Sequence, residues 1–475
     1  DAYLAALPGR DVIRERLTAM WNYPRVGLPH REGGRLFFTK NTGLQKQSPY
    51  YTSRGTTAAD VAGAALVLDP NAISKDGSTS LSMFAPDPSG RYVAYGLSEG
   101  GADWVTMRVH GHPLPAQRRL SEGGADWRSV RVKRLADGRD LADRVDWIRY
   151  SGVSWTRDGN GFFYTRYPAP PKDAGTGKTL SGASRDPVVY YHRLGTAQAA
   201  DVAVFRYPKE PTWGVGADVS EDGRWLFATV GRGTDPENHL YVADLKRPVN
   251  PDVRARLVPV DTTLEASFSP VGVAGNTLYV HTNLGAPKYK LVAVDLGAPG
   301  GYGNRANWRT VIAETGNTLE GVTLAGGRLF ARYLADVKSQ VTIHDLAGNR
   351  VGALPLPDAG TLAGLSGRAD SPELFYGFTS YLTPGSVYRY DVRTGKSEPF
   401  FTPDVPFDAS RYETEQVFYT SKDGTRVPMF VVHKRGMARD GGNPTMLYAY
   451  GGFNVSLQPA FSASVAAWLD MGGVY

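Results

Sequence analysis

Leu291-Val292-Ala293-Val294-Asp295-Leu296 is the stretch that decides the fold, because its pattern returns along most of the chain. An apolar alternation of this kind is typical of a β-strand. Similar segments lie at 66–69, 190–194, 240–245, 341–346 and 387–392, with a weaker copy at 130–135. Asp244, Asp295, Asp345 and Asp391 follow one another at intervals of 51, 50 and 46 residues. We interpret each segment as the closing strand of one repeated unit.

A second pattern alternates with the first and predicts tight hairpins. Asp-Gly or a similar turn separates two apolar segments at 84–92, 155–162 and 219–225, and Gly supplies the positive φ that such turns need. Repeats of about 40–50 residues with about four strands each are typical of a β-propeller. Seven closing strands predict seven blades, which we place at residues 25–404. A stack of two sheets is the alternative, and the regular period argues against it.

The two ends of the chain follow other patterns. Residues 10–21 carry apolar side chains at helical spacing, and Tyr23-Pro24 ends this helix. Residues 418–433 predict a hairpin, 445–450 a buried strand and 461–470 a helix, with a further strand from Gly473. Strand, helix and strand in this order predict the beginning of an α/β sheet. We therefore expect three parts: a helical piece at 1–24, the propeller, and the start of an α/β domain at 405–475.

One repeat does not follow the blade period. Leu97-Ser98-Glu99-Gly100-Gly101-Ala102-Asp103-Trp104 returns unchanged at 120–127. We interpret this identity as a recent duplication or a sequence artefact, and expect 105–127 to be an extra excursion on an early blade.

Composition excludes several classes of function. Hydrophobic content of 41% with 11% aromatic residues indicates a well-packed protein. The net charge of +6 comes with no long cationic run, so we expect a solvated surface and no nucleic-acid partner. Without cysteine there is no thiolate nucleophile, disulfide or zinc-thiolate site. No apolar run is long enough to cross a membrane. We predict neither metal nor cofactor.

Three short motifs resemble functional sites, and each has a better structural interpretation. Gly96-Leu97-Ser98-Glu99-Gly100 matches the G-x-S-x-G nucleophile elbow, but a further predicted strand follows it instead of a helix, so we expect a hairpin turn. Residues 175–179 resemble a phosphate-binding loop whose first glycine is missing. His110 and His112 lie in the duplicated excursion with no third ligand nearby, so we expect exposed loop residues.

The candidate site that remains is Tyr448-Ala449-Tyr450-Gly451-Gly452-Phe453-Asn454. A neutral phenol can donate one hydrogen bond to a developing oxyanion. Glycines beside Tyr450 let a substrate backbone approach, and Phe453 can form a flat apolar wall. The alternatives are that Tyr450 is a structural residue at a strand end and that Phe453 belongs to the core.

These residues resemble the prolyl oligopeptidase family of serine peptidases. The similar stretches are 41–45, 94–98, 101–104, 155–159, 421–425, 427–430 and 448–454. The resemblance implies a seven-bladed β-propeller that caps an α/β-hydrolase domain built from both chain ends. It implies that Tyr450 is half of an oxyanion hole, that Phe453 stacks on the substrate proline, and that Gly451, Gly452 and Asn454 join this binding loop. Phe163 matches a propeller aromatic of the third substrate subsite.

The resemblance also implies proline-containing oligopeptides as substrates and a propeller that excludes folded proteins. Flat aromatic contacts suit proline, which has a rigid ring and no N–H. The family's Ser, Asp and His would follow residue 475, so we expect a mainly β fragment with an incomplete α/β-hydrolase domain that is itself inactive. We expect a monomer, and favour a cytoplasmic over a periplasmic location. The alternatives are a non-catalytic, peptide-binding propeller and a related peptidase with another P1 preference.

Overall fold

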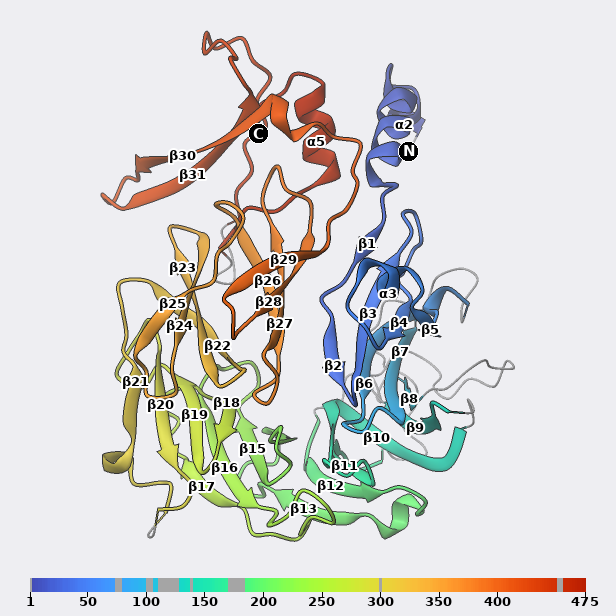
Figure 1. Ribbon diagram of the computed structural model, residues 1–475, viewed down its shortest axis with the longest axis vertical. Helices are drawn as coiled ribbons and strands as arrows, with labels where there is room; N and C mark the ends of the chain where they lie inside the picture. Colours follow the sequence, from blue (N-terminus) through green and yellow to red (C-terminus); the bar gives the residue numbers. More distant parts are fainter. Residues whose placement is uncertain are drawn as a thin grey trace.

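The structure is mainly β, with its sheets arranged in a ring beneath a small α/β segment (Figure 1). It is a computed structural model that describes residues 2–72, 79–99, 106–109, 128–136, 140–169, 184–298, 301–450 and 456–475. The α-helices among these are α1 (Ala2–Ala5), α2 (Arg10–Trp21), α3 (Ala58–Ala62) and α5 (Ala463–Asp470). None of the described helices has the length and apolar character needed to cross a membrane.

The first two sheets of the ring are the least regular. The first contains β1 (Arg25–Val26), β2 (His30–Glu32), β3 (Arg35–Asn41), β4 (Tyr50–Ser53) and β5 (Ala65–Leu68). The second has eight strands: β6 (Thr79–Pro86), β7 (Tyr92–Glu99), β8 (Thr106–Val109), β9 (Arg128–Arg134), β10 (Asp140–Trp155), β11 (Gly161–Arg166), β12 (Val188–Arg193) and β13 (Val202–Arg206). The excursion predicted at 105–127 falls here. Residues 110–127 lie outside the described part, and β8 and β9 both pair with β7.

Four regular sheets follow, each with four antiparallel strands in chain order. The third sheet contains β14 (Gly214–Val219), β15 (Trp225–Gly231), β16 (Asn238–Asp244) and β17 (Val258–Asp261), and the fourth contains β18 (Phe268–Ala274), β19 (Thr277–Thr282), β20 (Lys290–Asp295) and β21 (Arg309–Ile312). The fifth contains β22 (Thr318–Ala325), β23 (Arg328–Ala335), β24 (Lys338–His344) and β25 (Arg350–Ala353). The sixth contains β26 (Thr361–Gly367), β27 (Glu373–Thr379), β28 (Ser386–Asp391) and β29 (Lys396–Phe401). This confirms the predicted β-propeller, with six sheets around the ring.

The segments predicted as closing strands mostly occupy another position. β16, β20, β24 and β28 are each third in their sheet, and a fourth strand lies outside each of them. The prediction that they close the unit was wrong there. The fourth strands alternate less clearly because one edge of each is free, and half-exposed residues carry little periodic signal.

The core lies between the faces of consecutive sheets. Trp225 and Leu240, for example, pack against Phe268 and Val280 of the next sheet, and similar clusters follow around the ring. The last sheet packs on the first through Phe375, Val387 and Phe400 against Leu36 and Phe38. These two sheets share no described strand. Burial of apolar side chains therefore closes the ring.

The predicted Asp-Gly hairpins are confirmed, and Gly223 shows why glycine is needed. Its φ is +78°, and a Cβ there would lie 2.3 Å from Cβ of Arg157 in a neighbouring turn. The backbone N–H of Trp225 donates to the Ser220 hydroxyl at 2.9 Å and completes the turn. The turns at 87–90, 157–160 and 221–224 each join two neighbouring antiparallel strands of one sheet.

The C-terminal segment forms a small sheet over one face of the propeller. β30 (Tyr412–Thr420) and β31 (Arg426–Lys434) form the predicted hairpin. Val432 and Tyr475 exchange both backbone hydrogen bonds, at 2.7 and 2.9 Å, and Thr445 forms a parallel bridge with Val474. α5 lies between these last two strand segments in the chain, which gives a strand–helix–strand crossover.

The strand predicted as buried at 445–450 differs from the prediction. Only Thr445 pairs, and Leu447 and Tyr450 are 81% and 48% exposed. An apolar run indicates burial only if sheet neighbours lie on both sides of it, and among the described residues this segment has a neighbour on one side.

The two ends of the chain meet. Met20 of α2 packs against Ala463, Ala466 and Ala467 of α5, and Arg16 lies 3.0 Å from Asp470. Residues from the first and last parts of the chain thus form one unit beside the propeller (Figure 1).

Candidate functional site

Tyr450 is the last residue of the predicted binding loop that lies within the described part of the chain. It ends the segment that pairs with Val474, and its side chain is about half exposed. Gly451, Gly452, Phe453 and Asn454 lie outside the described residues. The phenol is therefore accessible to solvent at the start of the predicted binding loop.

The segment that carries Tyr450 is fixed to one face of the propeller by contacts with its last two sheets. The backbone N–H of Phe461 donates to the Thr379 hydroxyl at 3.0 Å, and Gln416 Nε2 donates to the Asp336 carbonyl at 2.7 Å. The ring of Tyr381 packs against Phe430 and Tyr475, with centroids 5.5 and 5.9 Å away. Burial in this contact raises the pKa of Tyr381 to about 12, so its hydroxyl stays protonated. The propeller face toward this segment is the side on which a site around Tyr450 would lie.

Phe163, the predicted third-subsite residue, lies inside the propeller wall. Its side chain is completely buried in β11, and its ring centroid is 5.2 Å from that of Tyr191. Val215 and Leu226 of the next sheet complete the cluster. The ring is not exposed to solvent, and its position supports a packing role.

The prediction of a hairpin turn at the G-x-S-x-G motif was wrong, because the described residues of the motif, 96–99, lie within a strand. Ser98 lies within β7 and pairs with Ser80 of β6, so no strand-to-helix turn exists at this serine. His110, His112 and residues 175–179 lie outside the described part of the chain.

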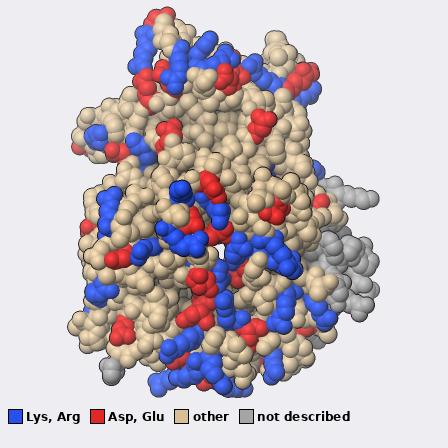
Figure 2. Space-filling model, in the orientation of Figure 1, with Lys and Arg blue, Asp and Glu red and all other residues tan. Residues whose placement is uncertain are grey.

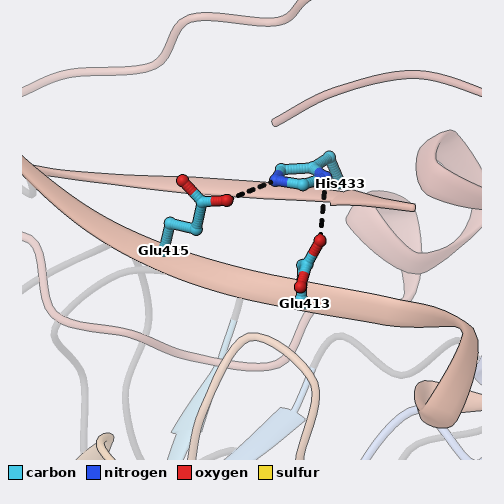
Figure 3. A group of neighbouring side chains, drawn as sticks. All are labelled: Glu413, Glu415 and His433. Atoms are coloured by element: carbon cyan, nitrogen blue, oxygen red, sulfur yellow. Dashed lines mark hydrogen bonds and ion pairs between the residues drawn. The ribbon is translucent and has the colours of Figure 1, made fainter. Parts of the chain in front are cut away.

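A group that the sequence analysis did not find lies on the C-terminal hairpin (Figure 3). His433 is buried directly opposite Glu413, and its Nε2 is 3.1 Å from Oε1 of Glu415. The Nδ1–H donates to the Lys434 carbonyl at 2.9 Å, and Glu413 is 3.8 Å from that same nitrogen. The two carboxylates therefore face opposite nitrogens of one imidazole ring. A single metal ion can bind only one of these two nitrogens.

The charges around this group also favour an ion-pair network over a metal site. Arg439 donates to Glu415, and Arg435 lies 3.4 Å from Glu413. Hydrogen bonding to His433 is the main cause that lowers the pKa of Glu415. The sequence does contain a signal, a Glu-x-Glu alternation on one strand of the hairpin and a histidine on the other. This signal can be recognised only when the register of the two strands is known.

A second unforeseen group is fully buried in the propeller. His192 of β12 contacts Asp201 through Nδ1 at 2.7 Å and Asp143 through Nε2 at 3.2 Å. Tyr164 donates its hydroxyl to Asp201 at 2.5 Å. Burial lowers the pKa of His192, but the hydrogen bonds to the two aspartates outweigh it and raise the pKa to about 9. Because none of these side chains reaches solvent, the group supports the fold rather than catalysis.

Comparisons with known proteins agree on one family. The model of the prolyl oligopeptidase N-terminal β-propeller domain matches residues 1–112 and 119–403. A prolyl endopeptidase from Elizabethkingia meningoseptica is 37% identical over 474 residues, which are 100% of this chain and 61% of that protein. Prolyl oligopeptidase A from Amanita bisporigera is 31% identical, over 99% of this chain and 61% of that protein.

Solved structures give the same result. Prolyl oligopeptidase B from Galerina marginata, bound to a 35mer hydrolysis and macrocyclization substrate, has a TM-score of 0.84 at 29% identity. The match covers 100% of this chain and 64% of the chain in that structure. The chain spans about 61% of the length of the curated relatives that it matches first.

Proposed function

The chain belongs to the prolyl oligopeptidase family, and on this basis we propose that it is part of a serine endopeptidase that hydrolyses oligopeptides on the carboxyl side of proline. The observation that carries the proposal is the 37% identity to a prolyl endopeptidase along the whole chain. The exposed phenol of Tyr450 beside the propeller face supports it.

The propeller of this enzyme has seven blades, because the eight-stranded sheet counts as two. β10 bends in its middle, where Trp147 and Tyr150 have φ of +66° and +50° and the register shifts between Ile148 and Val153. Ala94 and Val130, from before the bend, share one apolar cluster with Phe162 from after it. Face-to-face packing of this kind is expected of two neighbouring blades and not of one flat sheet.

The C-terminal segment is the first edge of an α/β-hydrolase sheet, completed by the N-terminal helix. The hairpin β30–β31, the antiparallel contact of Val432 with Tyr475 and the parallel bridge of Thr445 with Val474 support this assignment. The packing of Met20 on α5 supports a domain made from both ends of the chain.

In the complete site, the hydroxyl of Tyr450 donates a hydrogen bond to the oxyanion of the tetrahedral intermediate. Gly451 and Gly452 let the peptide backbone approach, Phe453 stacks on the proline ring, and Asn454 completes the loop. The serine that attacks the carbonyl, with its histidine and aspartate, is supplied by residues after 475. Phe163 remains a proposed third-subsite residue, although its buried ring would have to move to contact a peptide.

The test is a comparison of substrates with the full-length product of the gene. Fluorogenic peptides that differ only in having Pro, Ala or Arg before the scissile bond are hydrolysed in parallel, and a clear preference for Pro is expected. A preference for Arg or Ala before the scissile bond would show that the protein is a related peptidase with a different specificity. Binding of the peptides without hydrolysis would favour the non-catalytic propeller. The 475-residue chain alone is expected to hydrolyse none of them.

A further inference from the structure

A cavity of about 240 Å³ lies in the middle of the propeller ring. Its walls include the first strands of three consecutive sheets, β14, β18 and β22, and Ala369, which follows β26 of the sixth sheet. The third and sixth sheets are not neighbours in the ring. Residues of both sheets can line one cavity only where the sheets face each other across the centre. We call this space the channel cavity.

The channel cavity is apolar over most of its wall. Phe227 of β15, Val273 of β18 and Leu324 of β22 contribute large apolar side chains to it. Its volume is below the roughly 300 Å³ at which pockets for whole drug-sized ligands begin. The cavity therefore suits a single side chain or a chain end of a larger ligand, and a polar group on that part of the ligand needs a polar partner in the wall.

Asp218 and Thr229 supply the polar groups that can serve as such partners. Asp218 of β14 pairs with Phe227, and Thr229 pairs with Gly216 two residues further along the same two strands. Because alternate residues of a strand share a face, the side chains of Asp218 and Thr229 lie on the same side of this hairpin. Among the described residues, neither the Asp218 carboxylate nor the Thr229 hydroxyl has a hydrogen-bond or ion-pair partner.

The Asp218 carboxylate lies where its charge is unfavourable. The residue is exposed, but the protein around it raises the pKa of its carboxyl, and burial is the only cause of this shift. A group at the wall of a cavity has this combination, because solvent reaches it while protein surrounds it on most sides. An unpaired charge in such a place destabilises the fold, and a cation bound from outside would remove the destabilisation.

Glu221, the other acidic residue that lines the channel cavity, already has partners. It accepts a hydrogen bond from the backbone N–H of Ala369 at 3.1 Å and lies 3.2 Å from Arg368. On the face of the propeller drawn in Figure 2, acidic side chains likewise lie beside basic ones. Asp218 differs from these residues, because no basic side chain of the described part of the chain pairs with it.

We propose that Asp218 binds a cationic group of a peptide inside the propeller, either a basic side chain or the free amino terminus. The carboxylate and the cation form a charge-assisted hydrogen bond, and the Thr229 hydroxyl accepts a second hydrogen bond from the same cation. Phe227 and Leu324 pack against the aliphatic stem that carries the charge. The choice of a peptide as the ligand rests on the proposed function, whereas the preference for a cation rests on Asp218.

Binding of short peptides to the 475-residue chain tests this inference. Two alanine-rich peptides are acetylated and amidated, and carry one lysine or one norleucine, which have similar aliphatic stems and differ in charge. A third peptide has norleucine and a free amino terminus, and distinguishes the two sources of the cation. Calorimetric titration measures each Kd. A cationic peptide should bind about tenfold more tightly than the acetylated norleucine peptide, the ratio expected for one charge-assisted hydrogen bond.

Asp218→Asn removes the charge and keeps the size of the side chain. In this variant the acetylated norleucine peptide and the cationic peptides should bind equally. Glu210→Gln is the matched control, because it removes the same charge from an exposed residue that precedes β14 and does not line the channel cavity. The tenfold preference should remain in this control.

Three results would overturn the proposal: equal affinity of the parent for all three peptides, no measurable binding of either cationic peptide at millimolar concentration, or an unchanged preference in Asp218→Asn. Asp218→Asn also removes an unpaired charge, so its urea midpoint should equal or exceed that of the parent, and a lower midpoint would indicate a structural role instead. The titration measures binding and not cleavage. A negative result therefore leaves the proposed peptidase function intact, and a protein that does not prefer Pro can still show the effect of Asp218.

Discussion

Nδ1 of His192 lies 2.7 Å from Oδ1 of Asp201 at a place where neither side chain reaches solvent. Asp143 occupies the other ring nitrogen, so the imidazole has an acceptor on each side. Because each ring nitrogen faces a carboxylate, both nitrogens of His192 keep their protons. The wall of the propeller therefore contains a buried imidazolium cation.

The stability contributed by His192 should depend on pH. Because its pKa is raised from 6.5 to about 9 on folding, its contribution is complete below pH 6.5 and is lost as the pH rises through about 9. A shift of this size corresponds to about 3 kcal/mol. Urea unfolding of the parent and of His192→Gln at pH 6 and pH 10 measures it. The difference between the two proteins should shrink at the higher pH, and an equal difference at both would contradict the prediction.

Tyr450→Phe in the full-length protein removes one hydroxyl and leaves the ring. If the phenol donates to the oxyanion, kcat should fall about hundredfold to thousandfold with little change in KM. Tyr448→Phe is the matched control, since Tyr448 is two residues away and 59% exposed. Equal effects of the two substitutions would exclude a special role for Tyr450.

Gly223→Ala should destabilise the propeller more than Gly424→Ala does. Both glycines have positive φ, +78° and +84°, so each substitution pays the same backbone strain, about 1 kcal/mol. Only at Gly223 would the new Cβ overlap Arg157, which adds about 1–3 kcal/mol. Urea unfolding of both variants provides the comparison, and equal losses would show that the neighbouring turn moves away freely.

Phe400→Ala should weaken the contact that closes the ring. Phe400 is buried between the last and first sheets, with ring centroids 5.1 Å from Phe375 and 6.2 Å from Phe38. The expected loss is about 3–5 kcal/mol. Phe401→Ala, at the adjacent and less buried position, should cost less. Hydrogen exchange in β3 and β27 should rise only in Phe400→Ala, and unchanged exchange there would contradict the role in closure.

The sequence allowed most of the propeller to be predicted because its signals are local. Apolar alternation located the third strands, and Asp-Gly pairs located the hairpins. α2 was also predicted, but not its burial: Val12 and Ile13 are 69% and 42% exposed, and only Met20 is buried. Periodicity identifies a helix, whereas the face that is covered depends on a partner such as α5.

The candidate site could be predicted only in part. Tyr450 could be proposed as a site residue because its motif is contiguous, and its role stays a prediction. The contact between Asp143 in β10 and His192 in β12 joins residues that are far apart in the chain and strands that are not neighbours in their sheet. It depends on the assembly of the whole sheet, which no local pattern indicates.

The contact between Met20 and Ala466 has a consequence for folding on the ribosome. The partner of α2 is synthesised only after every blade, so the N-terminal helix must wait for its contact while the propeller forms. Non-local contacts of this range form late and slowly. Until then the apolar face of α2 is open to chaperones, and the order of events is propeller first, then the union of the two chain ends.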